Sequence, residues 1–176
     1  MKKLMFCLVL LFVSMPLLAG MMGIGVGVHG GVEMMVPDGE DTEIFPAIGG
    51  ALDFSLPGIP IGLRGDFEYA WKTIDDVKVT DIIILLGPQF NLVLPGAPMS
   101  FYVGAGGQLA MSSYDYPGAE GATDFGFLAY AGANYSMGMI GIFAEVGYGM
   151  IFSEDEEMEI PNLTNIPIRG GIKFSL

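Results

Sequence analysis

The stretch 61–72, with the sequence IGLRGDFEYAWK, alternates with a period of two residues. Its odd positions are apolar, aromatic or glycine, and its even positions are charged or small: Gly62, Arg64, Asp66, Glu68, Ala70 and Lys72. In a β-strand these two sets point to opposite faces. A soluble barrel would turn the aromatic face to its core, whereas a barrel in a bilayer would turn it to lipid and enclose polar residues. This strand alone leaves both alternatives open.

Seven other segments repeat the same alternation, and in most of them the polar phase consists of Gly, Ala, Ser, Asn or Gln. The pattern predicts eight strands at residues 23–36, 46–56, 61–72, 81–94, 99–112, 124–136, 140–152 and 164–176. An even number of strands of this length can cross a bilayer when tilted. The sequence therefore predicts an all-β fold, an eight-stranded antiparallel up-and-down transmembrane β-barrel with its apolar residues outward.

The connections between these strands fall into two kinds. Short turns rich in Pro and Gly are expected at 57–60, 95–98 and 137–139. Longer loops are expected at 37–43, 73–80, 113–123 and 153–163, and most of the 20 acidic residues lie in or beside them. Outer-membrane barrels have short periplasmic turns and longer extracellular loops. This asymmetry favours the membrane alternative and predicts that both chain ends lie in the periplasm.

The first 20 residues, MKKLMFCLVLLFVSMPLLAG, have a basic start, an apolar run and small residues at Ala19 and Gly20. This is the pattern of a secretory signal peptide, so we expect a signal peptide at 1–20 and one barrel domain at 21–176. Cys7, the only cysteine, lies in this leader. The mature chain would then contain no disulfide and no cysteine metal ligand.

The formal charge of the chain is −13, with only seven Lys and Arg residues. These basic residues are scattered singly, apart from the Lys2–Lys3 pair in the leader. Nucleic acid binding needs a clustered basic surface, so nucleic acid is excluded as a partner.

The alternation, the loop asymmetry and the closing segment PIRGGIKFSL make this chain resemble the small eight-stranded outer-membrane barrels of the OmpX and OmpA-transmembrane-domain type. The resemblance implies an outer-membrane location in a diderm bacterium, with membrane lipid and lipopolysaccharide as its surroundings, and a monomeric barrel. It also implies that the outer-membrane assembly machinery recognises the last strand. Such proteins usually end in an aromatic residue, whereas this chain ends in Leu176 and has Phe174 two positions earlier.

No catalytic, cofactor-binding or metal-binding residue is predicted. The only histidine, His29, lies on the inward phase of a glycine-rich strand, and no Ser-His-Asp arrangement is marked around it. The acidic run 154–157 lacks the spacing and the glycine of a calcium-binding loop. We therefore expect a protein that is not an enzyme and that needs no cofactor.

The inward phases carry opposite charges at similar heights, which predicts a lumenal network of ion pairs formed by His29, Asp53, Arg64, Asp66, Glu68, Glu145, Arg169 and Lys173. Counted from the turns, Asp53 and Arg64 have equal heights on neighbouring strands, and Glu145 falls between Arg169 and Lys173. Strand closure should bring His29 near Arg169, and Asp66 and Glu68 should add acceptors from across the barrel. Buried charges are costly when they are unpaired, so these groups are expected to pair.

The function predicted from these features is that of a structural or surface-interaction barrel, which presents acidic external loops and has a lumen closed by ion pairs. Two alternatives remain open. The first is a barrel that forms a narrow transport route or binds a small ligand, and the second, less favoured, is an outer-membrane lipid-modifying enzyme.

Overall fold

The computed structural model describes residues 23–37, 42–56, 58–74, 77–115, 121–152 and 163–175. These residues form eight β-strands: β1 (Gly23–Pro37), β2 (Glu43–Ser55), β3 (Ile61–Ile74), β4 (Val77–Val93), β5 (Met99–Tyr114), β6 (Ala122–Met137), β7 (Ile140–Phe152) and β8 (Leu163–Ser175). The expected signal peptide, most of the acidic loop residues and Leu176 lie outside the described residues. Within the described part of the chain, no helix is long and apolar enough to cross a membrane.

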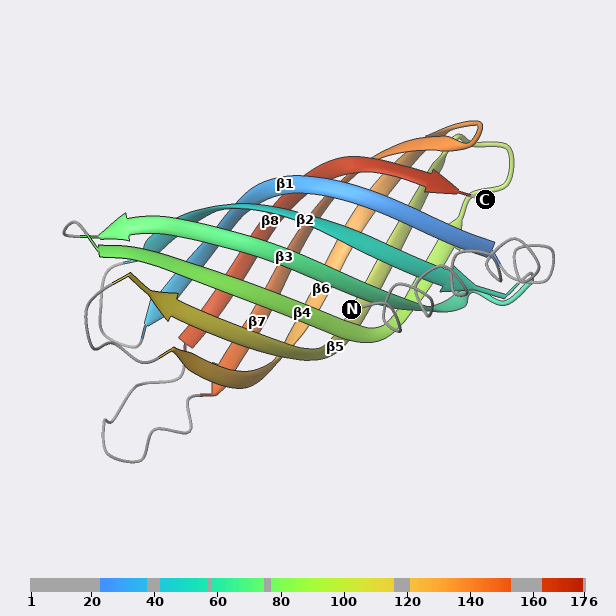
Figure 1. Ribbon diagram of the computed structural model, residues 1–176. Coiled ribbons are helices and arrows are strands. Elements are labelled where there is room, and N and C mark those ends of the chain that lie inside the picture. The colour runs from blue at the N-terminus through green and yellow to red at the C-terminus, as the bar shows by residue number, and fades with distance from the viewer. Residues whose placement is uncertain are drawn as a thin grey trace, which may run out of the picture.

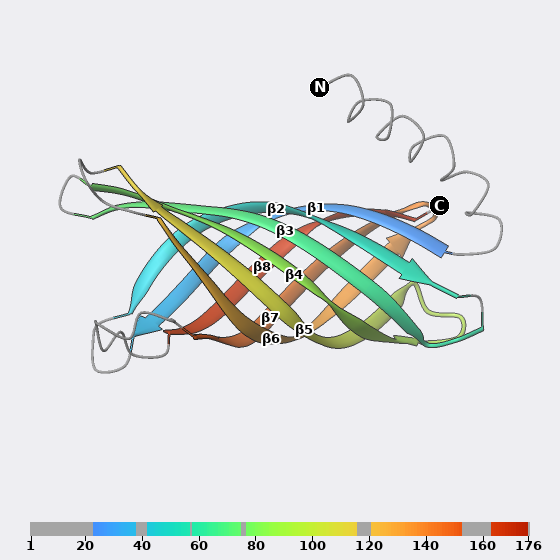
Figure 2. The same cartoon turned by 60° about the horizontal axis from the view of Figure 1, so that its bottom comes forward.

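The eight strands form one closed antiparallel barrel, in which each strand pairs with its sequence neighbours and β1 pairs with β8 (Figures 1 and 2). The register pairs Val28 with Ile172 across the closing seam, and the pairing continues along both strands from Gly25 to Pro37. Closure satisfies the edges that an open sheet would leave unpaired. The predicted fold class is confirmed.

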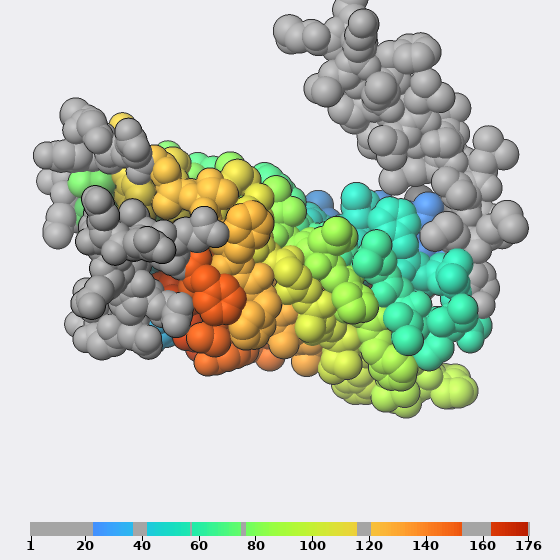
Figure 3. All heavy atoms as spheres, turned by 90° about the horizontal axis from the view of Figure 1, so that it is seen from below, coloured from blue at the N-terminus to red at the C-terminus, as the bar shows by residue number. Residues whose placement is uncertain are grey.

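The outer wall is apolar and the charged side chains point inward. Val28, Leu86 and Phe125 are apolar, and yet they are 60%, 59% and 59% exposed. Arg64 and Glu68, by contrast, are 3% and 0% exposed. Figure 3 shows the outward side chains of the strands packed into a continuous wall along the barrel. This is the reverse of a water-soluble barrel, and it confirms the predicted assignment of faces.

The two ends of the barrel differ, as Figures 1 and 2 show. At the turn end, which also holds the end of β8, Gly58, Gly96 and Gly138 have φ angles of 77°, 78° and 72°. Glycine is the residue that adopts this backbone region without strain. In the turn after β4, Ala97 donates its N–H to the Leu94 carbonyl over 3.1 Å. The Pro-Gly pair at its centre is the preferred sequence of a type II turn.

The opposite end, the loop end, departs from the prediction in one connection. The segment 73–80 was expected to be a long loop, but β3 runs to Ile74 and β4 begins at Val77, so only two residues separate the strands. The alternation continues through this segment, and Ile74 and Val79 pack on the interior. β-branched residues favour a strand here. Three connections at the loop end therefore remain longer than a tight hairpin, instead of the expected four.

The interior near the loop end is apolar, which the sequence pattern did not predict. Inward side chains from six strands form a buried apolar cluster: Met35, Phe45, Ala47, Ala70, Ile83, Ala110 and Ile151. We call this group the apolar cluster. A second buried cluster, formed by Leu85, Tyr102, Leu128 and Tyr130, also departs from the expectation of a small and polar lumen.

Candidate functional site

Small inward residues make room for the large side chains of the lumen. A Cβ atom added to Gly49 would collide with the imidazole of His29, and one added to Gly104 would collide with the ring of Tyr130. The glycine-rich polar phase therefore has a packing function, because it leaves space for large side chains from neighbouring strands.

Arg64 connects opposite walls of the barrel. It lies on β3, and its Nη1 donates to Oε2 of Glu145 on β7 over 2.5 Å. These strands are four apart in a ring of eight, so this contact crosses the whole lumen. The Nη2 atom of Arg64 also donates to Oδ2 of Asp66 over 2.7 Å. Paired carboxylates hold a guanidinium strongly because the hydrogen bonds are charge-assisted.

Two tyrosine rings lie beside the Arg64 guanidinium. Its central carbon is 5.0 Å from the ring centre of Tyr130 and 5.9 Å from that of Tyr102. The two rings meet edge to face with their centres 6.4 Å apart. Cation–π contacts stabilise a guanidinium that has lost its water. Both rings are buried inside the barrel together with Leu85 and Leu128.

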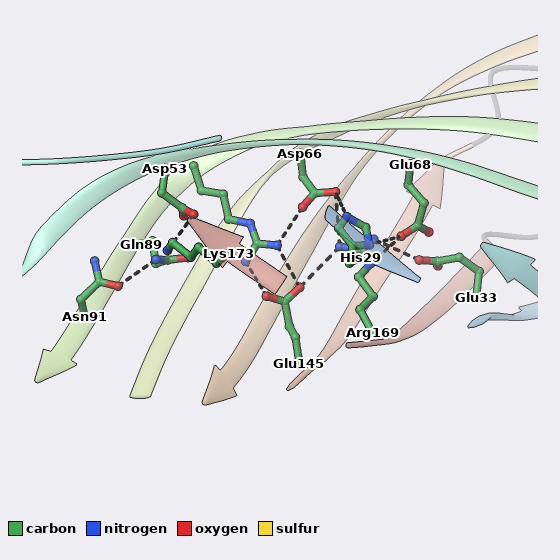
Figure 4. Close-up of polar contacts among 11 residues, drawn as sticks. His29, Glu33, Asp53, Asp66, Glu68, Gln89, Asn91, Glu145, Arg169 and Lys173 are labelled. Carbon is green, nitrogen blue, oxygen red and sulfur yellow. Dashed lines mark hydrogen bonds and ion pairs between the residues drawn. The ribbon is translucent and has the colours of Figure 1, made fainter. Parts of the chain in front are cut away.

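Arg169 on β8 lies within 4 Å of four carboxylates, two of which also contact Arg64 (Figure 4). Its Nη2 donates to Oε1 of Glu33 over 3.0 Å, and its Nε lies 2.7 Å from Oε2 of Glu68. Its Nη1 is 3.5 Å from Oε1 of Glu145 and 3.8 Å from Oδ1 of Asp66. Glu145 is therefore shared by both arginines, and the contacts form one connected network.

His29 enters this network from β1. Its Nε2 lies 3.2 Å from Oδ1 of Asp66, and its Nδ1 lies 3.7 Å from Oε2 of Glu68. His29 and Arg169 thus face the same two carboxylates, as their predicted proximity implied. His29, Asp66 and Glu68 also place three potential metal-ligand atoms within 4.8 Å of one another.

Two predicted pairings differ in the structure. Asp53 and Arg64 are opposite each other in register, but Asp53 pairs with Lys173, whose Nζ lies 2.8 Å from its Oδ2. Gly25 of the intervening strand β1 allows this contact, since a Cβ there would collide with the Lys173 side chain. Arg64 reaches past Asp53 to Glu145.

Glu145 does not contact Lys173 either. In the β7–β8 register Glu145 is opposite Arg169, whereas Lys173 is opposite Gly141, four residues away. Four residues correspond to about 13 Å along a strand, which is too far for an ion pair. Glu145 therefore lies level with Arg169, not between the two basic residues as predicted.

Glu33 is the network member that the sequence reasoning missed. Its side chain is fully buried, and besides Arg169 it accepts a hydrogen bond from Asn165 over 3.3 Å. Asn165 in turn accepts one from Gln108 over 3.3 Å. All three residues are on the inward phase of their strands, so the period of two was a sufficient signal.

Toward the turn end the lumen opens into a vestibule of about 400 Å³. Its lining includes the Asp53–Lys173 pair and neutral polar groups such as Gln89 and Asn134. Between this vestibule and the guanidinium of Arg64 lies a void of about 10 Å³, which is about the space needed to hold one water molecule.

Comparison with family models and with curated proteins finds no match to the sequence. Solved structures with a similar fold include Neisserial surface protein A, NspA, with 14% identity and a TM-score of 0.69 over 87% of this chain and 96% of that one. The attachment invasion locus protein Ail of Yersinia pestis matches with 12% identity and a TM-score of 0.59 over 88% of this chain and 99% of that one. The N-terminal β-barrel domain of Pseudomonas aeruginosa OprF matches with 12% identity and a TM-score of 0.56 over 86% of this chain and 97% of that one. At these identities the likeness concerns the fold alone, and the fold of this chain is that of the small eight-stranded outer-membrane β-barrels.

Proposed function

We propose that this protein is a structural or surface-interaction barrel of the outer membrane, whose lumen is closed and whose acidic loops face outside the cell. The observation that carries the proposal is the network of Arg64 and Arg169, which joins opposite walls at mid-barrel through buried carboxylates. The apolar cluster lies next to it on the loop-end side. Eight strands enclose only enough space for side chains to fill.

The apolar exterior supports a location in lipid, because large apolar side chains on the outer face of all eight strands would otherwise be exposed to water. In this proposal the turn end and both termini lie in the periplasm, and the loop end lies outside, among lipopolysaccharide. The last strand carries the signal for the outer-membrane assembly machinery. The barrel is a monomer, with no enzymatic activity and no nucleic acid partner.

Planar-bilayer conductance of the purified protein tests the closed lumen. If the network and the apolar cluster close the lumen as proposed, the wild type should give no steady channels. Glu145→Ala, which removes the carboxylate shared by both arginines, is the comparison for transient leaks. Large, steady conductance of the wild type would overturn the proposal.

A narrow transport route or a small-ligand site is the second candidate, and the turn-end vestibule is the observation that favours it. In that case the vestibule would take up a small polar solute, and conductance or bound solute would reveal it. A lipid-modifying enzyme is the third candidate. The side chain of His29 is 0% exposed, which argues against a histidine-centred reaction on lipid.

A further inference from the structure

The buried network has an excess of negative charge. Among the described residues it contains four carboxylates, from Glu33, Asp66, Glu68 and Glu145, but only two guanidiniums. None of these six side chains is more than 3% exposed. The Asp53–Lys173 pair is neutral by itself and contributes nothing to this excess. Buried uncompensated charge is costly, so the network needs two further positive charges.

The unused donor and acceptor atoms show where those charges belong. Nδ1 of His29 and Oε1 of Glu68 are buried and have no hydrogen-bond partner among the described residues. Oε2 of Glu68 faces the Arg169 Nε at 2.7 Å, but the two are not aligned as a hydrogen bond. Nδ1 of His29 points at this carboxylate from 3.7 Å, which is too long for a hydrogen bond. A ring nitrogen of His29 and the Glu68 carboxylate thus lie close together with no hydrogen bond between them.

This geometry suits a metal ion. One ligand atom from each of His29, Asp66 and Glu68 lies within 4.8 Å of the others. Two ion-to-ligand bonds of about 2.0–2.2 Å, placed end to end, come close to that separation. Mg²⁺ and Ca²⁺ prefer oxygen ligands, whereas one imidazole with two carboxylates suits Zn²⁺ and similar transition metals. Arg169 lies 2.7 Å from Oε2 of Glu68 and 3.8 Å from Oδ1 of Asp66, and Arg64 contacts the other oxygen of Asp66, so the two arginines would hold these carboxylates in place beside the ion.

We propose that His29, Asp66 and Glu68 bind one divalent transition-metal cation of the Zn²⁺ type inside the barrel. Two added positive charges bring the network to neutrality, with four negative and four positive charges. The ligands are enclosed, so the ion binds while the strands close around it. The site is independent of whether the lumen conducts, because metal content and conductance are separate measurements.

The test uses the full chain without a polyhistidine tag, unfolded in urea and refolded into detergent micelles with Co²⁺ or with EDTA. Free metal is removed by gel filtration, and cobalt per folded barrel is measured by mass spectrometry. The wild type is expected to retain about one Co²⁺, and His29→Gln and Glu68→Gln should retain at least about tenfold less. Asp53→Asn is the matched control, since it removes a lumenal carboxylate outside the site and should retain the ion.

A second measurement needs no variant and therefore does not depend on variant folding. His29 is the only histidine in the chain, so ¹⁵N-histidine labelling reports one imidazole. Refolding with Co²⁺ should shift or broaden both ring-nitrogen signals. Unchanged His29 signals, or cobalt content in the wild type as low as in His29→Gln, would overturn the proposal and assign the two positive charges to bound protons.

Discussion

Removal of the Glu145 side chain tests the network most directly. In Glu145→Ala, Arg64 loses its 2.5 Å hydrogen bond and keeps only Asp66, and Arg169 loses a 3.5 Å contact. Breaking a buried ion pair costs about 3–5 kcal/mol, and a hydrogen bond to a charged group contributes about 1.5–3 kcal/mol. Arg64 retains one partner and the carboxylate excess falls by one. We therefore expect the free energy of unfolding to fall by about 2–4 kcal/mol.

The assay is reversible urea unfolding in lipid vesicles, followed by the fluorescence of Trp71, the only tryptophan. Glu43→Ala is the control, because Glu43 pairs with Lys72 where their side chains are 36% and 30% exposed. Exposed pairs contribute less than about 1 kcal/mol. A double-mutant cycle with Arg64→Met should give a coupling of at least about 1 kcal/mol. If Glu145→Ala costs no more than Glu43→Ala, the network does not stabilise the barrel.

Three further predictions concern the faces, the orientation and the polar relay. Leu86→Arg or Val103→Arg should lower the free energy of unfolding in vesicles by about 2–4 kcal/mol near the bilayer midplane. Gln108→Arg should cost less, because it points into a lumen with excess negative charge, and equal costs would reverse the assigned faces. Epitope tags at Gly39, Gly118 or Glu156 should be labelled on intact cells and tags at Gly58 or Gly96 should not; labelling at Gly58 would invert the barrel. Asn165→Leu removes the hydrogen-bond acceptor of Gln108 and one of the two donors to Glu33, which keeps Arg169. It should cost about 1–3 kcal/mol in the same unfolding assay, whereas no change would remove Asn165 from the network.

The faces and the register could be predicted because both follow from local rules. A period of two assigns each residue to one face, and a tight turn fixes which residues of two neighbouring strands are opposite. Asp53 is thus opposite Arg64, as counting from the turn predicts. These rules need no knowledge of side-chain length or of the barrel diameter.

The apolar cluster was missed because the inward phase was assumed to be polar throughout. Residues 82–86 have the sequence IIILL and are apolar on both phases, which indicates a strand buried on its inner face as well as covered by lipid on its outer face. Ile83 and Leu85 are indeed both 2% exposed. The continuous apolar run was the available signal on β4, and Phe45 on β2 and Ile151 on β7 belong to the same apolar cluster as Ile83.

The choice of ion-pair partners depends on the width of the lumen, which no local rule contains. Side chains on neighbouring strands leave the wall nearly parallel, so the long stem of Arg64 carries its guanidinium past the short carboxylate of Asp53. In a ring of eight strands the opposite wall is within reach of two long side chains, and Glu145 meets Arg64 there. The shorter Asp53 is instead reached by Lys173 across a glycine. Charge matching in such a barrel must therefore compare heights across the lumen and weigh side-chain length, because adjacency in the sheet selects the wrong partner for Arg64 and Asp53, although it pairs Glu145 with Arg169.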